Sequence, residues 1–196
     1  KLSDYLPELK GTNKEHMIIR DILLHQAGLK AWIPFYLKTI DVNKKPDKEH
    51  YRKTPDAEYC YRVAEGVYIC KTKQDSLLYQ KIYEGETDGG RTYKYSDLGF
   101  ILFTRLVERV SGKTLDRYVQ DNFYTPMGLE NIFYNPLQHG ISKNRIIPTE
   151  EDKYFRQQRI QGDVHDMGAA MLGGVSGHAG LFAQASDLVF TKTDVI

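Results

Sequence analysis

The residues best suited to chemistry lie in the run Tyr93-Lys94-Tyr95-Ser96-Asp97, directly before an apolar stripe with helical spacing. Ser96 is a good helix cap, so Tyr95 is expected beside the free N–H groups and the positive dipole end of a helix. Such a setting can stabilise a phenolate, and a phenolate can act as a general base. The alternative, which the residue types favour, is that Tyr95 packs against the helix entry and that Ser96 is only a cap.

A second group of candidates surrounds the glycine-rich stretch 173–180. A Gly-x-Ser-x-Gly nucleophile elbow around Ser176 would need glycine where His178 stands, so that motif is absent. Ser176 with His165 or His178 as its base is a possible dyad, although hydroxyls in glycine loops usually form turns. His165, Asp166 and His178 match no zinc-ligand spacing, so local hydrogen bonding is expected, with no metal and no cofactor.

The composition is that of an ordinary globular domain. The chain has 196 residues, of which 41% are hydrophobic and 27% charged, with a formal net charge of +1. This balance gives no support for a nucleic-acid or anionic-membrane partner, and the apolar runs are too short to span a bilayer. Cys60 and Cys70 fit neither a zinc site nor a redox motif; a disulfide is possible, and two free thiols are favoured.

Apolar periodicity, with glycine and proline as punctuation, predicts a mainly α chain with few short strands and no second-domain boundary. The clearest helix spans 97–111, because Leu98, Leu102, Leu106 and Val110 recur every four residues. Further helices are predicted at 13–28, 74–83, 114–125 and 164–172, and another begins at 186–190. One strand is predicted at 67–70. Long connections are predicted at 41–58 and 128–163.

Several segments resemble, in order, motifs of a known family. Ile22-Leu23-Leu24-His25-Gln26-Ala27-Gly28-Leu29 is similar to L-L-x-H-x-S-G-L, and Tyr95-Ser96-Asp97 is similar to Tyr-x-Asn. The stretches 162–166 and 177–182 are similar to a G-x-V-H-D and G-H-A-G-L-F region, and 1–9 and 108–129 add weaker matches. Over about residues 1–190 the chain therefore resembles the class C-like branch of the serine β-lactamase, penicillin-binding-protein and esterase superfamily.

This resemblance implies that 1–196 is a single partial β-lactamase-like domain with an insert at about 30–90. It would be the α-helical subdomain of the α/β β-lactamase/transpeptidase-like fold. The resemblance also implies an exported, periplasmic bacterial parent that acts on a small-molecule or cell-wall-derived substrate. The chain itself shows no signal segment.

Two motifs of the family's catalytic machinery are absent from these 196 residues. Ser-x-x-Lys would supply the nucleophile, and a strand with Lys-Thr-Gly or His-Thr-Gly would line the oxyanion side. Ser-x-x-Lys, Lys-Thr-Gly and His-Thr-Gly do not occur. We therefore expect a truncated fragment, inactive as this chain, which exposes apolar surface and self-associates.

The resemblance implies acyl-enzyme chemistry on an ester, a peptide amide or a β-lactam. Tyr95 would be the general acid/base, and Asp97 would orient the catalytic lysine. The family usually has Asn where Asp97 stands, and an ionised carboxylate cannot donate to a substrate carbonyl. Esters or peptidoglycan-derived amides are therefore expected to be preferred over β-lactams. The alternative function is a non-catalytic helical module that binds cell-wall fragments or a partner through its glycine loop and exposed aromatic residues.

Overall fold

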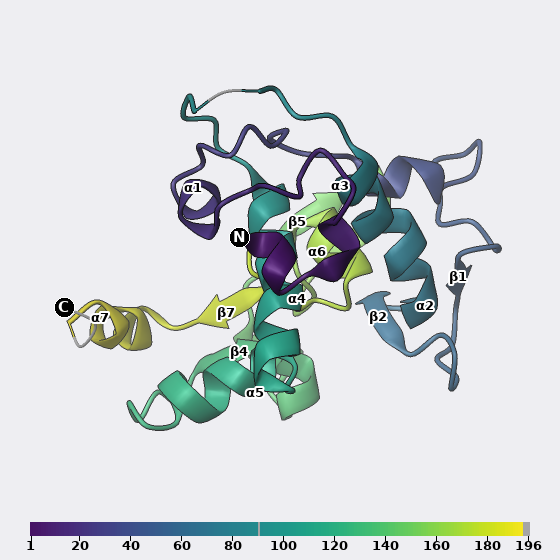
Figure 1. The fold of residues 1–196 in the computed structure, drawn as a ribbon. Coiled ribbons are helices and arrows are strands. Elements are labelled where there is room, and N and C mark those ends of the chain that lie inside the picture. The colour runs from purple at the N-terminus through teal and green to yellow at the C-terminus, as the bar shows by residue number, and fades with distance from the viewer. Residues whose placement is uncertain (90, 194–196) are drawn as a thin grey trace.

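The computed structural model describes residues 1–89 and 91–193, and its central element is helix α4, Asp97–Ser111 (Figure 1). Ser96 caps this helix, because its Oγ accepts a hydrogen bond from the N–H of Leu98 at 3.2 Å. Gly112 ends it in the left-handed conformation, with φ of 71°. Leu98, Ile101 and Leu102 of α4 are buried in the hydrophobic core. The helix therefore runs through the molecule with one apolar face inward.

Short helical segments from the first half of the chain pack around α4. They are η1 (Leu2–Asp4), η2 (Pro7–Leu9), α1 (Ile19–Leu23), η3 (Phe35–Lys38), α2 (Lys71–Gln74), η4 (Asp75–Tyr79) and α3 (Gln80–Glu84). The last three run on without a break, with a π-helical turn in the middle. Leu2, Leu6, Ile22, Leu78 and Ile82 lie in the same core cluster as α4.

Three small antiparallel sheets complete the body. In the first, β3 (Val67–Ile69) lies between β1 (Tyr51–Arg52) and β2 (Tyr61–Ala64). In the second, β4 (Ile132–Tyr134) pairs with β7 (Leu181–Ala183), with Phe133 opposite Phe182. In the third, β5 (Glu150–Asp152) pairs with β6 (Gln158–Ile160).

The other helical segments lie in the second half of the chain. They are α5 (Leu115–Val119), η5 (Gln120–Tyr124), η6 (Pro136–His139), η7 (Lys143–Arg145), α6 (Met167–Met171) and α7 (Ala185–Thr193). Figure 1 shows α5 below α4, and β7 and α7 extending away from the body to one side. The glycine-rich stretch before β7 returns to α4 and packs against it.

The prediction of a mainly α fold is wrong, because the chain is 38% helical and 13% strand and has three small sheets. The predicted connection over 128–163 contains β4, β5 and β6. The predicted helix over 13–28 shrinks to α1. The missed strands, β1 and β2 among them, have two to four residues each, too few to show a period of two in the sequence.

Other predictions about the elements are confirmed. The helix at 97–111 has the predicted bounds, and a strand and helical segments lie within or around the ranges 67–70, 74–83, 114–125 and 164–172. Both cysteines are free thiols, with Cys60 exposed and Cys70 buried. Among the described residues, no helix has both the length and the apolar character that a bilayer crossing requires.

Candidate active site

Tyr95 lies at the entry to α4, with 55% of its surface exposed. Its neighbours hold the backbone tightly. The Oγ of Ser96 donates to the carbonyl of Lys30 at 2.7 Å, and the N–H of Asp97 donates to the carbonyl of Ala31 at 3.0 Å. The phenol is therefore fixed at its base and open to solvent at its tip.

His25 contacts this entry through its backbone and its ring. Its carbonyl accepts from the N–H of Lys94 at 2.8 Å, and its Nδ1 accepts from the N–H of Ser96 at 3.1 Å. Its ring lies 4.6 Å from the ring of Tyr95 and 5.4 Å from the ring of Phe100, centroid to centroid. In the sequence, His25 is one position of the L-L-x-H-x-S-G-L resemblance, and nothing in the local pattern predicts its contact with Tyr95.

The electrostatics of Tyr95 are set by the next acidic residue. The negative charge of Asp97, with a hydrogen bond between the two side chains, raises the pKa of Tyr95 above its usual value. The charge of Asp166 acts in the same direction more weakly. The helix end alone would favour the phenolate, and the charge of Asp97 opposes that effect and favours the protonated phenol.

A second hydrogen-bonded chain joins the glycine-rich stretch to α6. Ser176 Oγ lies 2.8 Å from His178 Nδ1, and His178 Nε2 lies 2.9 Å from Asp166 Oδ1. Asp166 also caps α6 by accepting from the N–H of Ala169 at 2.7 Å. Burial raises the pKa of the Asp166 carboxyl, but the hydrogen bonds from His178 and from the α6 backbone outweigh it and hold the pKa below its usual value. The carboxylate therefore fixes the His178 proton on Nε2, leaving Nδ1 to accept from Ser176.

This serine–histidine–aspartate chain is buried away from any substrate. Ser176 is 1% exposed, and the side chain of His178 is 4% exposed. Ser176 Oγ also faces Thr104 Oγ1 of α4 at 3.4 Å, and the N–H of Gly177 donates to that same Thr104 oxygen at 2.8 Å. The arrangement ties the stretch 173–180 to α4 and α6, and it gives Ser176 no room for attack on a carbonyl.

Close backbone approach explains the glycines of this stretch. Gly174 has a φ of +83°, and a Cβ there would lie 2.1 Å from Asn135 Oδ1. A Cβ on Gly177 would lie 2.5 Å from the carbonyl oxygen of Phe100, in the first turn of α4. A side chain on Gly177 would push the stretch off α4, and one on Gly174 would push against Asn135.

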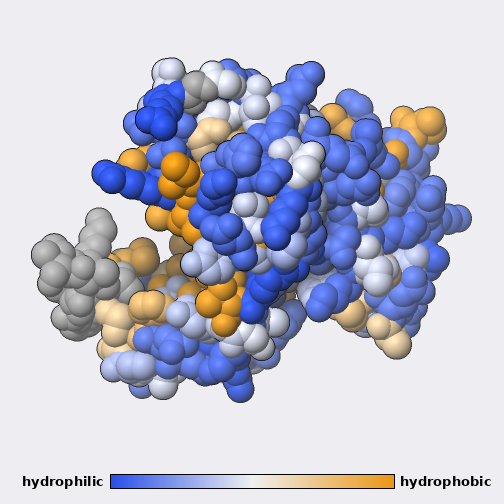
Figure 2. Space-filling model, viewed as in Figure 1, coloured by the Kyte–Doolittle hydropathy of each residue, from blue (hydrophilic) through white to orange (hydrophobic). Residues whose placement is uncertain are grey.

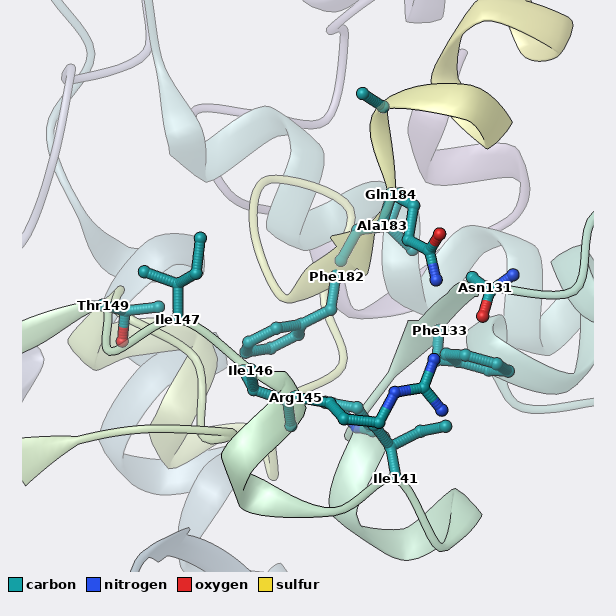
Figure 3. A pocket seen from close by; sticks show the side chains of 13 residues that line it. Asn131, Phe133, Ile141, Arg145, Ile146, Ile147, Thr149, Phe182, Ala183 and Gln184 are labelled. Carbon is teal, nitrogen blue, oxygen red and sulfur yellow. The ribbon is translucent and has the colours of Figure 1, made fainter.

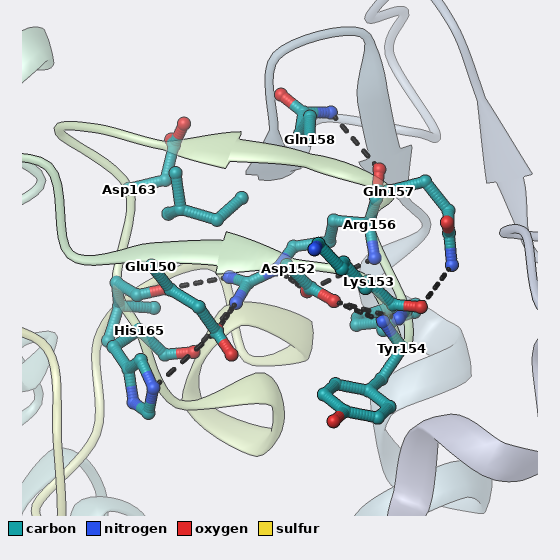
Figure 4. Close-up of polar contacts among 12 residues, drawn as sticks. Glu150, Asp152, Lys153, Tyr154, Arg156, Gln157, Gln158, Asp163 and His165 are labelled. Atoms are coloured by element: carbon teal, nitrogen blue, oxygen red, sulfur yellow. Dashed lines mark hydrogen bonds and ion pairs between the residues drawn. The ribbon is translucent and has the colours of Figure 1, made fainter.

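Two arginines hold the segment just before α6, and Figure 4 shows the contacts of one of them, Arg156. Arg62 of β2 makes a bidentate pair with Asp163, at 2.6 and 2.9 Å. Arg156 pairs with Asp152 at 2.7 Å and donates to the carbonyls of Val164 and His165 at 2.6 and 2.7 Å. These contacts place Asp166 at the start of α6.

His165, a candidate base and metal ligand, takes no part in the hydrogen bonds among Ser176, His178 and Asp166. Its Nε2 lies 3.5 Å from Glu150 Oε2, and its side chain is 66% exposed. The structure thus brings Asp166 and His178 together and leaves His165 apart from them.

A pocket of about 570 Å³ lies elsewhere, between the β4–β7 pair and residues 141–149 (Figure 3). Phe133, Ile141 and Phe182 line it together with Arg145 and Thr149. No acidic, histidine or cysteine residue is in its lining. It can hold an apolar group, but it offers no acid–base pair for catalysis.

Comparison with known proteins gives consistent results. Residues 1–189 match the family model described as Beta-lactamase. The chain is 30% identical over 205 residues to an N-acetylmuramyl-L-alanine amidase of Bacillus subtilis, covering 96% of this chain and 41% of that protein. It is 34% identical over 191 residues to a putative D-alanyl-D-alanine carboxypeptidase of Escherichia coli K12, covering 92% of this chain and 38% of that protein.

Solved structures agree on the fold. A class C beta-lactamase superposes with a TM-score of 0.54 at 12% identity, covering 97% of this chain and 40% of the other. The octameric penicillin-binding protein homologue from Pyrococcus abyssi superposes with a TM-score of 0.55 at 14% identity, covering 97% and 37%. The chain thus spans about two fifths of the length of the relatives it matches.

Proposed function

This chain belongs to the beta-lactamase family of serine hydrolases, and on that premise we propose that it forms part of an active site working through an acyl-enzyme. The bond cleaved is an ester, a peptide amide or a β-lactam. The observation that carries the proposal is the Tyr95-Ser96-Asp97 entry to α4. There a solvent-facing phenol and a carboxylate stand side by side on a backbone fixed by hydrogen bonds.

In this proposal Tyr95 moves the proton and Asp97 orients an amine. Asp97 raises the pKa of Tyr95, which favours the protonated phenol, a proton donor to a leaving group. A lysine ammonium between the two side chains would pair with Asp97 and lower the pKa of Tyr95, so that the phenol could also accept a proton. The lysine and the serine nucleophile would come from a Ser-x-x-Lys motif, which these 196 residues lack.

The proposed substrate is derived from the bacterial cell wall. The two relatives are named as an amidase of N-acetylmuramyl-L-alanine and as a putative D-alanyl-D-alanine carboxypeptidase. Asp97 accepts hydrogen bonds where the family's amide can also donate. We therefore place peptide amides and esters ahead of β-lactams, and we place the parent protein outside the cytoplasmic membrane, where the cell wall is.

The first test is to sequence the coding DNA on both sides of the segment. A Ser-x-x-Lys motif upstream and a Lys-Thr-Gly-like motif downstream are expected. The extended protein should then form an acyl adduct with a fluorescent penicillin or a p-nitrophenyl ester, detected by intact mass, while the 196-residue chain forms none. An extended protein that binds D-alanyl-D-alanine peptides without turnover would support the binding-module alternative instead.

The substrate preference has its own test. Asp97→Asn in the extended protein is expected to raise the rate of β-lactam acylation relative to ester cleavage. Glu151→Gln, an exposed carboxylate on β5, is the matched control for loss of one negative charge. An unchanged ratio of the two rates in Asp97→Asn would contradict the proposed role of the carboxylate.

A further inference from the structure

His25 accepts hydrogen bonds from the backbone N–H groups of the two residues that flank Tyr95. Its carbonyl oxygen accepts from the N–H of Lys94 at 2.8 Å, and its Nδ1 accepts from the N–H of Ser96 at 3.1 Å. One residue thus bonds to the amide before Tyr95 and to the amide after it. The two bonds fix the backbone on either side of the Tyr95 Cα, and with it the direction in which the phenol leaves the chain.

The ring of His25 also contacts the phenol itself. The rings of His25 and Tyr95 lie 4.6 Å apart with a tilt of 39°. Phe100 lies 5.4 Å from the imidazole, and Tyr93 lies 5.9 Å from it edge-on. The imidazole is therefore the centre of an aromatic cluster, and 55% of the Tyr95 surface stays exposed beside it.

The backbone of His25 adopts the conformation that these contacts need. Its φ is +55°, in the left-handed region, where residues other than glycine are uncommon but histidine is enriched together with asparagine and aspartate. The residue follows α1 and turns the chain so that its carbonyl and its ring face the same neighbour. Histidine thus suits both the backbone conformation and the two hydrogen bonds at this position.

These contacts assign one tautomer to His25. The N–H of Ser96 can only donate, so Nδ1 must be unprotonated and the ring proton must be on Nε2. Any residue at position 25 can offer its backbone carbonyl to the N–H of Lys94. The N–H of Ser96 needs more: the side chain of residue 25 must carry an acceptor where Nδ1 lies. An aromatic ring without an acceptor would keep the stacking and lose the bond.

We propose that His25 is a positioning residue for Tyr95: its Nδ1, its carbonyl and its ring together set the orientation of the phenol in the active site. The inference rests on the proposed role of Tyr95 as acid/base, but the geometry that it asserts can be measured without turnover. His25 acts through Tyr95 and touches no reacting atom.

The experiment compares His25→Phe with His25→Asn. Phenylalanine keeps the ring and removes the acceptor, while asparagine tolerates positive φ and offers an oxygen acceptor without the ring. Amide hydrogen exchange by NMR reads the bonds of Ser96 and Lys94 separately in the 196-residue chain. His139→Phe and His139→Asn are matched controls, because His139 stacks on Phe133 at 5.0 Å in η6.

In His25→Phe, the Ser96 amide is expected to exchange on the order of tenfold faster, the effect of one lost hydrogen bond. The Lys94 amide, which bonds to the backbone carbonyl, should change little. In His25→Asn the Ser96 amide should stay protected. Equal loss of protection at both amides in His25→Phe would overturn the proposal, since loosened packing acts on both together.

The unmutated chain gives a check that does not depend on folding of the variants. The nitrogen chemical shifts of the His25 imidazole should report the Nε2–H tautomer, and an Nδ1–H tautomer would contradict the assignment. In the extended protein, His25→Phe should lower kcat by up to about 10²-fold with little change in KM, because the phenol is misplaced. If the extended protein is inactive but the Ser96 and Lys94 amides exchange as expected in the variants, the proposed function is wrong, and His25 still positions Tyr95.

Discussion

Replacing Arg156 with methionine tests whether the buried ion network before α6 holds the structure together. The side chains of Arg156 and Asp152 are both 0% exposed and pair at 2.7 Å. The guanidinium also donates to the carbonyls of Val164 and His165. Methionine keeps most of the length of the side chain and removes every donor. The carboxylate of Asp152 would then stay buried with only backbone N–H partners, those of Tyr154, Phe155 and residue 156.

The expected loss is large because a charge remains buried without its partner. Breaking a buried pair in this way costs about 3–5 kcal/mol of unfolding free energy. For a chain of this size each kcal/mol lowers the melting temperature by about 2–4 °C, so the fall should be about 6–20 °C. Arg159 provides the control on β6: it is 62% exposed and lies 3.7 Å from Glu151. Arg159→Met should cost less than about 1 kcal/mol.

The assay is urea unfolding followed by circular dichroism, with equal slopes required before the midpoints are compared. The double variant Arg156→Met/Asp152→Asn should recover part of the loss, because it removes the unpaired buried charge and keeps an oxygen that accepts from the backbone N–H groups. If Arg156→Met unfolds within about 1 kcal/mol of Arg159→Met, the network does not carry the stability assigned to it.

Three further predictions concern other parts of the chain. Because the folded-state pKa of Asp166 is lowered, its stabilising effect is complete above its usual pKa of 3.8 and is lost as the pH falls through the folded-state pKa. The stability difference between the wild type and Asp166→Asn should therefore shrink below about pH 4, as measured by urea unfolding across pH; a constant difference would refute this. Ser176 should not react with a fluorophosphonate, and labelling that Ser176→Ala abolishes would show that it is accessible after all. Leu23 and Leu24 at the end of α1 are 52% and 46% exposed, and Figure 2 shows apolar patches on the molecular surface. This exposed apolar surface should make the 196-residue chain self-associate and bind a hydrophobic dye; a monomeric, dye-negative chain in sedimentation would count against it.

The sequence predicted well where local pattern decides the structure. Helix α4 was foreseen with its cap at Ser96 and its end at Gly112, because an apolar stripe, a capping side chain and a glycine all agree there. Tyr95 was correctly placed at the entry of this helix. The sequence does not reveal that the pKa of Tyr95 is raised, because this shift depends on how the fold places the Asp97 carboxylate beside the phenol.

The sequence failed where distant contacts decide. The predicted helix at 13–28 is interrupted because Lys14, 1% exposed, turns its ammonium toward the carbonyls of Tyr83 and Gly85. That contact spans about seventy residues, and no local pattern reveals it. Strand β4 likewise exists because it pairs with β7, far along the chain. The Asp152–Arg156 pair shows the same limit, since charges four residues apart look like a solvated loop until burial is known.

Gly177, which packs against α4, and Gly174, which packs against Asn135, also limit how this sequence can change over generations. At Gly174 and Gly177 even one added methyl group would collide with Asn135 or with the backbone of Phe100. In a saturation-mutagenesis survey these two positions should reject alanine as firmly as tryptophan, unlike an exposed position such as Val42, which is 98% exposed. Residues 173–180 should therefore accept substitutions more slowly than the rest of the chain. This stretch can then anchor sequence alignments with relatives that have diverged elsewhere.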